Sequence, residues 1–288
     1  MTQRSRALLK RTAPSEPRYA APALDKGLDI LELLSTQQRG LTRSEIAEQL
    51  QRSVGEVFRM IERLTQRGYL VQQADTFTLG MKLFELSHQF PPMNRLLKEA
   101  LPRMERLAKA VDQSCHLSVL SGARQLIVAQ VDTPGGVGFS VKIGATLDLV
   151  KSASGRVLLA FQSDEDARRL IALADPALTA ASTRTVLTTI RQIAKVGFAF
   201  SPSRQFSGVE AISYPILDLH RRAIAALTVP YVTHLDDKTR TEASDAQCAL
   251  AAVAADINAA LGSGPAESSE RRSPPRTGPS AGPGPRGL

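Results

Sequence analysis

One pair of adjacent residues has side chains that could do covalent chemistry. Cys115 and His116 stand next to each other, and a thiol activated by an imidazole is a common nucleophile. The surrounding residues 115–120 alternate as in a β-strand, however, and successive side chains of a strand point to opposite faces. We therefore expect one of the two in the core and the other at the surface or in a pocket, without a nucleophile–base contact.

Other signatures of catalysis and of cofactor binding give no support to an enzyme. HExxH, CxxC and Walker-type GxxxxGK[ST] sequences do not occur, and His88, His220 and His234 lie too far apart to show metal-ligand spacing. The glycine-rich run 135–138 precedes strand-like sequence instead of a helix, so it predicts a loop and not a phosphate cradle. We expect no catalytic residue, no metal and no cofactor.

The positive charge of the chain is concentrated at its two ends. The 288 residues have a formal net charge of +8, of which residues 1–20 carry +4 and residues 262–288 carry +2. The C-terminal segment is rich in Pro, Gly and Ser, and we expect both tails, 1–22 and 262–288, to be disordered. Such tails attract phosphate without reading sequence, so DNA binding must be argued from a motif.

The sequence has no sign of a membrane-spanning or secreted protein. No apolar run approaches the roughly 18–20 residues that span a bilayer, and the basic N-terminus lacks the apolar segment of a secretory signal. Two cysteines make neither a disulfide framework nor a metal site. We expect a cytoplasmic protein with no membrane partner.

A helix predicted at residues 53–67 has the pattern of a DNA-reading element. Val54, Val57, Ile61 and Leu64 recur at helical spacing and predict its inner face. Its outer face carries arginine, which can fork onto guanine, and glutamate, which can accept from a cytosine amine. Its glycine costs helix stability but would permit close approach to DNA. The candidate DNA-binding residues, one of them from the preceding helix, are Arg43, Arg52, Ser53, Gly55, Glu56, Arg59 and Arg63.

The elements around this helix complete a winged helix-turn-helix at residues 23–90. Leu24, Leu28, Leu31 and Leu34 recur at helical spacing in a first helix. Thr42 and Glu45 form a capping-box pattern at the start of a second helix, 42–50, and residues 69–79 alternate as a small β-hairpin. The alternative is that these helices bind a protein partner instead of DNA.

Residues 91–261 are predicted to form a linker helix and an α+β domain. The linker helix, 91–112, begins at paired prolines and has an apolar stripe of Leu97, Leu101, Met104 and Leu107. The domain that follows, 113–261, mixes strand and helix patterns. Its predicted strands are 115–120, 125–131, 139–142, 212–217 and 223–229, and its predicted helices are 157–161, 164–173, 188–195 and 237–261.

Four blocks of the sequence resemble the IclR family of bacterial transcription regulators. They are 24–31 (LDKGLDIL) with 41–47, 58–70 (Phe58-Arg59-Met60-Ile61 to Arg67-Gly68-Tyr69-Leu70), 144–160 (with ASGRVLLA) and 208–229 (with GVEAISYPI and AALTV), in family-like order and spacing. The resemblance implies a C-terminal GAF-like effector-binding domain after the winged helix-turn-helix. It also implies a homodimer or tetramer, and a dimer would read an approximately palindromic double-stranded DNA operator.

The resemblance also places an effector-binding site in the second domain. Carried over residue by residue, it implies contacts from the start of a helix, from a loop with the strand after it, and from the last strand. These residues are Leu149, Ala153, Ser154, Ser201, Ala211, Thr228 and Pro230. A helix start favours a carboxylate, with Lys151 and Arg204 as candidate counter-charges, so we expect a small organic acid such as a sugar acid or an aromatic acid.

The sequence therefore predicts a transcriptional regulator that binds DNA sequence-specifically under control of a small organic-acid effector. The alternative is a ligand sensor that acts through a protein partner, with the winged helix as the interaction surface. An enzyme with a fused helical domain ranks third, because its catalytic residues would have to come from distant segments.

Overall fold

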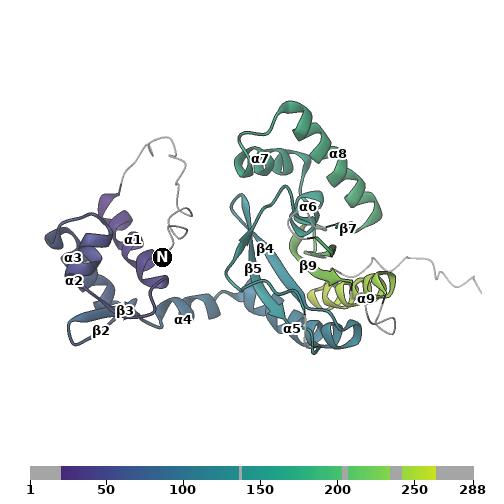
Figure 1. Cartoon of the computed structure of the whole chain (residues 1–288). Helices are drawn as coiled ribbons and strands as arrows, with labels where there is room; N and C mark the ends of the chain where they lie inside the picture. The colour runs from purple at the N-terminus through teal and green to yellow at the C-terminus, as the bar shows by residue number, and fades with distance from the viewer. Residues whose placement is uncertain (1–20, 136–137, 203–206, 234–241, 264–288) are drawn as a thin grey trace, which may run out of the picture. The chain divides into compact units, whose positions relative to one another are not determined.

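A computed structural model describes residues 21–135, 138–202, 207–233 and 242–263 (Figure 1). They form two compact units divided between Asn94 and Arg95. The predicted tails, 1–22 and 262–288, lie almost wholly outside the described residues, as do Arg204 and the start of the helix predicted at 237–261. Within the described residues, none of the helices is long and apolar enough to cross a membrane.

The first unit is a three-helix bundle with a small antiparallel sheet. Its elements are α1 (Pro22–Ser35), β1 (Leu41–Thr42), α2 (Arg43–Gln49), α3 (Val54–Gln66), β2 (Leu70–Gln73), β3 (Thr76–Leu79) and α4 (Lys82–His88). The strand order is β1-β3-β2, so the β2–β3 hairpin forms the wing. The predicted capping box of Thr42 and Glu45 is confirmed at the start of α2.

The core of this unit corrects two predicted helix faces. Ile30 and Leu34 of α1 pack with Val57 and Ile61 of α3, together with residues of α2 and the sheet. Leu24 is 61% exposed and Leu28 46%, although both belonged to the predicted apolar stripe of α1. Val54, placed on the inner face of α3, is also 46% exposed. Residues one position apart on a helix lie 100° apart, so only the packing partner decides which of two apolar stripes is buried.

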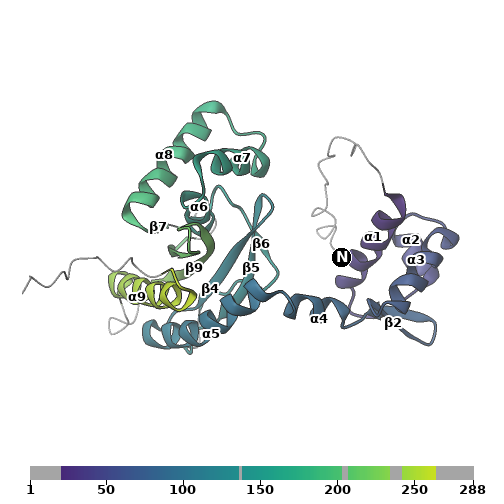
Figure 2. The same cartoon turned by 180° about the vertical axis from the view of Figure 1, so that it is seen from behind.

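The second unit is an α+β domain built on one antiparallel sheet. It comprises most of α5 (Pro91–Val111), β4 (Cys115–Ser121), β5 (Arg124–Val131), β6 (Thr146–Leu147), α6 (Ala153–Ala160), α7 (Asp164–Ala174), α8 (Ala180–Val196), β7 (Ala199–Pro202), β8 (Val209–Leu217), β9 (Ala223–Val232) and α9 (Ala243–Leu261). The strand order is β6-β5-β4-β9-β8-β7. Helices α6, α7 and α8 lie on one side of this sheet and α5 and α9 on the other (Figures 1 and 2).

The structure corrects several predictions in this unit. Residues 139–142 are not a strand, and the chain pairs with β5 only at 146–147. The helix predicted at 188–195 begins at Ala180, and β7 was not predicted at all. In α5 the buried stripe contains Leu96 and Ala100 before Met104, whereas Leu101 is exposed. As in α1, a second apolar stripe one residue away fitted the sequence pattern equally well.

Candidate functional site

The start of α3 has a capping box, and an ion pair joins the same residues to α1. The Ser53 hydroxyl accepts from the Glu56 amide at 3.3 Å, and one Glu56 carboxylate oxygen accepts from the Ser53 amide at 3.0 Å. Lys26 of α1 donates to the other oxygen at 2.9 Å. The lysine and the two Ser53 donors hold the pKa of Glu56 down at about 2. The Glu56 carboxylate is therefore already bonded within the unit.

Two of the candidate arginines also have partners inside the first unit. Arg52 donates to Asp29 of α1 at 2.8 Å, and Arg43 donates to Glu62 of α3 at 2.8 Å. The guanidinium carbon of Arg43 also lies 4.9 Å from the centre of the Phe58 ring. These contacts join the turn before α3 to α1 and the start of α2 to α3.

The remaining candidates form an exposed surface on α3. Arg59 is exposed and has no hydrogen-bond or ion-pair partner among the described residues, while Arg63 contacts only Gln66, at 2.5 Å. Gly55 is also exposed, and a Cβ added there would meet nothing within 4 Å. Phe58, 43% exposed, was not predicted as part of this surface. The sequence signal that could have shown it is its position one residue after Val57, because neighbouring residues of a helix point in different directions. An apolar side chain on this surface can contact the thymine methyl.

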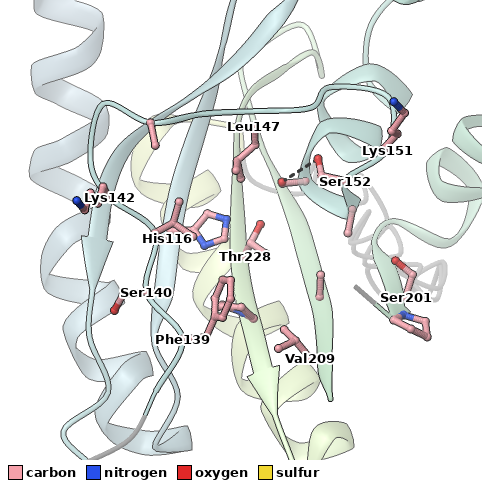
Figure 3. A pocket seen from close by; sticks show the side chains of 17 residues that line it. His116, Phe139, Ser140, Lys142, Leu147, Lys151, Ser152, Ser201, Val209 and Thr228 are labelled. Carbon is pink, nitrogen blue, oxygen red and sulfur yellow. Dashed lines mark hydrogen bonds between the residues drawn. The ribbon is translucent and has the colours of Figure 1, made fainter. Parts of the chain in front are cut away.

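A cavity of about 320 Å³ lies in the second unit against the sheet (Figure 3). It is lined from β4, β6, α6, β7, β8 and β9 and from the 139–145 segment. Six of the seven residues predicted for effector binding line it: Ala153, Ser154, Ser201, Ala211, Thr228 and Pro230. The seventh, Leu149, is buried in the core that packs against α6.

Close packing at the start of α6 explains where Leu149 lies. A Cβ added at Gly155 would lie 2.2 Å from the Leu149 carbonyl oxygen, so the glycine lets the 148–151 turn pack directly on the helix. The Ser152 hydroxyl caps the Gly155 amide at 3.0 Å. Acceptors for the amides of Ala153 and Ser154 are not found in the part of the chain that the structure describes. Both residues line the cavity, at the positive end of the helix dipole.

The wall of the cavity formed by the sheet contains a row of buried polar side chains. His116, Thr228 and Ser213 stand opposite one another in register on β4, β9 and β8 and are 4%, 2% and 0% exposed. The Thr228 and Ser213 hydroxyls lie 2.8 Å apart. His116 was not among the predicted effector-binding residues. The pattern of strand 115–120 left open which of Cys115 and His116 would face a pocket.

Cys115 and His116 are on opposite sides of β4, as strand alternation requires. The Cys115 thiol lies 3.5 Å from the Met104 carbonyl of α5, and burial raises its pKa to about 12. Burial lowers the pKa of His116, in the cavity, to about 4. A thiol in its protonated form on the far side of the sheet cannot act with this imidazole. Within the described residues there is also no cluster of three metal-ligating side chains.

The charged side chains that line the cavity are both cations. Lys142 and Lys151 belong to the lining, and no carboxylate does among the described residues. Lys151 lies 3.4 Å from Asp148 and 3.8 Å from Asp175, whereas Lys142 has no ion pair in the described chain. The lining thus holds two lysines, one of them paired with carboxylates, next to the positive end of the α6 dipole, an arrangement that suits an anion.

Known protein families match both units in order. Residues 23–74 match the IclR helix-turn-helix domain, and residues 93–259 match the domain described as bacterial transcriptional regulator IclR C-terminal. The chain belongs to the IclR family. The members of this family are transcriptional regulators and not enzymes, so the first unit is the DNA-binding domain and the second is the IclR effector domain.

Individual proteins give the same family assignment. The chain is 28% identical to the HTH-type transcriptional regulator BhcR of Paracoccus denitrificans over 238 residues, which covers 78% of the chain and 82% of BhcR. It is 26% identical to the Pca regulon regulatory protein of Pseudomonas putida, covering 76% and 77%. An IclR homologue from Microbacterium hydrocarbonoxydans in complex with 4-hydroxybenzoate has the same fold, with a TM-score of 0.68, 23% identity and coverage of 83% and 98%.

Proposed function

We propose that this regulator binds its operator through the exposed surface of α3 and that a small organic acid in the cavity controls the binding. The observation that carries the proposal is the charge of the cavity. Its two charged lining residues are Lys142 and Lys151, and the amides of Ala153 and Ser154 add donors at the start of α6. Such a site favours a carboxylate.

Contacts within the first unit divide the seven candidate DNA-binding residues into two groups. We propose that Arg59 and Arg63 contact base edges and that Gly55 lets the helix backbone approach the DNA closely. Arg43, Arg52, Ser53 and Glu56 are held by partners within the unit. In this proposal they position α3, and the remaining guanidinium donors of the two arginines contact phosphate.

A homologue with a bound ligand supports a class of effector for this chain. The protein from Microbacterium hydrocarbonoxydans binds 4-hydroxybenzoate, a small aromatic acid. An acid of this size fits a cavity of about 320 Å³, at the small end of the range usual for ligand sites. We propose that this chain also takes a small hydroxylated or aromatic acid, through the six predicted residues that line the cavity.

We also propose that the regulator acts as a homodimer or a tetramer of such dimers. Large apolar side chains are exposed on α1, on α4 and just after α4 in the first unit, namely Leu24, Leu28, Leu83, Phe84, Leu86 and Phe90. Exposed apolar side chains of this kind are typical of protein–protein contact surfaces. A symmetric dimer would place two α3 helices on two half-sites, so the operator would be an approximate palindrome.

The test is fluorescence anisotropy of the full-length protein with its own upstream DNA and with scrambled DNA of the same length. We expect tighter binding to the upstream DNA, affinity that falls as salt rises, and a shift when 4-hydroxybenzoate or gluconate is added. Equal affinity for both DNAs would favour the alternative, a sensor that acts through a protein partner. An unchanged anisotropy with every acid tested would count against the organic-acid effector alone.

A further inference from the structure

Phe58 is an aromatic side chain on the exposed surface of α3. Val57 before it is buried, whereas Phe58 is 43% exposed. It lies three residues after Gly55 and directly before Arg59, both of them exposed. Residues three or four apart on a helix share a face, so Gly55, Phe58 and Glu62 form one edge of this surface. The ring therefore belongs to the surface that carries the proposed DNA-binding residues.

The ring of Phe58 is supported by Arg43 of α2. The guanidinium carbon of Arg43 lies 4.9 Å from the centre of the Phe58 ring and 5.2 Å from the centre of the buried Phe77 ring of β3. The same guanidinium donates to Glu62 of α3 at 2.8 Å. A cation over an aromatic ring is attracted to it, and the ion pair holds the cation there. These contacts favour one position of the Phe58 ring before any partner binds.

An exposed aromatic ring favours a partner with apolar surface. If the ring covered a polar base edge, it would leave that donor or acceptor without a hydrogen bond, which costs free energy. Among the groups that base pairs present in the major groove, the methyl group of thymine is the apolar one. Contact with this methyl removes apolar surface of both the ring and the base from water, so it favours a T·A pair at that position.

The residues around Phe58 favour DNA over a protein as this partner. In α3, which the structure describes completely, the large apolar side chains that are exposed are Val54 and Phe58. Arg59 and Arg63 are exposed on the same helix, and the negative charge of Glu62 is compensated by Arg43. A protein contact usually uses a larger apolar patch. Cations next to a narrow apolar edge suit phosphates and base edges instead.

We propose that Phe58 contacts the methyl group of a thymine in the operator and that Arg43 positions the ring for this contact. The inference rests on the proposed function, in which the exposed surface of α3 binds the operator. It adds one base that the operator must contain and the residue that selects it.

Replacement of thymine by deoxyuridine tests the inference, because it removes the methyl group and leaves the pairing groups in place. Fluorescence anisotropy of the full-length protein compares duplexes of its own upstream DNA in which the thymines are replaced one at a time. We expect at least one replacement to weaken binding about three- to fivefold, the loss expected for one buried methyl group. A wild type that prefers upstream over scrambled DNA but tolerates every replacement would overturn this inference alone. A wild type without that preference would overturn the proposed function as well.

Two variants assign the methyl contact to Phe58. Phe58→Ala, whose fold is checked by circular dichroism, should bind unmodified DNA about three- to fivefold more weakly and should bind DNA with and without the methyl group equally. Val54→Ala shortens the other exposed apolar side chain of α3 and is the matched control, which should keep the full effect of the replacement. A methyl effect that persists in Phe58→Ala, or that disappears in Val54→Ala, would overturn the assignment. Unchanged DNA affinity in Phe58→Ala would favour a protein as the partner of the ring.

Methylated cytosine provides the converse test. At the position found with deoxyuridine, a C·G pair should weaken binding of the wild type, and 5-methylcytosine at the same position should restore about three- to fivefold of the affinity. Phe58→Ala should gain nothing from this methyl group. A wild type that also gains nothing would show that deoxyuridine acted through the shape of the DNA, which would overturn the contact.

Arg43→Lys tests the positioning role. Lysine keeps the positive charge but lacks the planar group that stacks on the ring. We expect the effect of the deoxyuridine replacement to fall to about twofold or less, because the ring loses its support. The salt dependence of binding should stay as in the wild type, since the number of cations near phosphate is unchanged. A methyl effect of full size in Arg43→Lys would overturn the role of Arg43.

Discussion

Lys26 and Glu56 are joined by an ion pair of 2.9 Å between the Lys26 ammonium and the Glu56 carboxylate. The pair connects α1 to the first turn of α3, and the same carboxylate closes the capping box with Ser53. The end of the helix that would enter the major groove is therefore fixed by the rest of the first unit. The proposed DNA-binding residues and the residues that stabilise the start of α3 are therefore neighbours, and substitutions can separate effects on DNA affinity from effects on stability.

Arg59→Ala should weaken binding to the operator without changing stability. Arg59 is exposed and unpaired in the described chain, so its loss removes no contact within the unit. If it contacts a base, the loss should be about 1–3 kcal/mol and confined to particular operator positions. Anisotropy with single-base variants of the operator measures this. Arg52→Ala is the control, because it leaves Asp29 without its partner and should lower the melting temperature as well.

Gly55→Ala should stabilise the first unit and weaken DNA binding. A Cβ at this position meets nothing within 4 Å, and alanine favours a helix over glycine by about 0.5–1 kcal/mol. If the backbone of α3 approaches the DNA closely, the added methyl group lies between them. Thermal melts and operator titrations of the same variant test both halves. A stabilised variant with unchanged affinity would remove Gly55 from the DNA-binding surface.

Acid should destabilise the first unit through Glu56 and Glu45. Arg39 and Thr42 hold the pKa of Glu45 at about 2, as Lys26 and Ser53 do for Glu56, from an ordinary value of 4.5. A lowered carboxyl pKa stabilises the fold above the unfolded pKa, and this stability is lost as the pH falls from about 5 to 2. Hydrogen exchange of the α2 and α3 amides, corrected for intrinsic rates, measures it. Glu45→Gln/Glu56→Gln should flatten the dependence; an unchanged profile in that double variant would contradict the assignment.

Gly155→Ala should destabilise the second unit. The added Cβ would lie 2.2 Å from the Leu149 carbonyl oxygen, which belongs to the backbone and cannot turn aside like a side chain. Overpacking of this kind costs about 1–3 kcal/mol. Denaturant unfolding measures the loss, with Gly55→Ala as a glycine-to-alanine control in open space. Equal stability of Gly155→Ala and wild type would show that the turn at 148–151 can move away.

Thr228→Val should cost stability through Ser213 and ligand affinity through the cavity. The valine leaves the buried Ser213 hydroxyl without its partner at 2.8 Å, which costs about 1–3 kcal/mol. Thr228→Val/Ser213→Ala removes both hydroxyls and should recover most of that stability. Affinity for a hydroxy acid, measured by calorimetry, should stay low in both variants. Recovered affinity in the double variant would mean that Thr228 acts only by packing.

The amino-acid sequence determined the local elements and the family. The Thr42–Glu45 capping box and the hairpin at 69–79 depend on neighbours within a few residues, and the structure confirms them. Helical spacing predicted that α1, α3 and α5 are helices but misplaced part of their buried faces. The resemblance also named residues of one cavity from segments far apart along the chain, six of which line it. Such features can be predicted because a local pattern depends only on nearby residues and because the resemblance carries positions over from the family.

Only the tertiary structure decided which faces are buried and which side chains are paired. The sequence could not choose between Leu24 and Ile30 for the inside of α1, because both lie on apolar stripes and α3 makes the choice. It could not show that Arg52 meets Asp29 while Arg59 stays unpaired. Nor could it place His116 beside Thr228, since that contact arises from the pairing of β4 with β9 across more than a hundred residues. Strand alternation puts Cys115 and His116 on opposite faces, but only the fold shows that His116 lies on the face that meets the start of α6 and Cys115 on the face that meets α5.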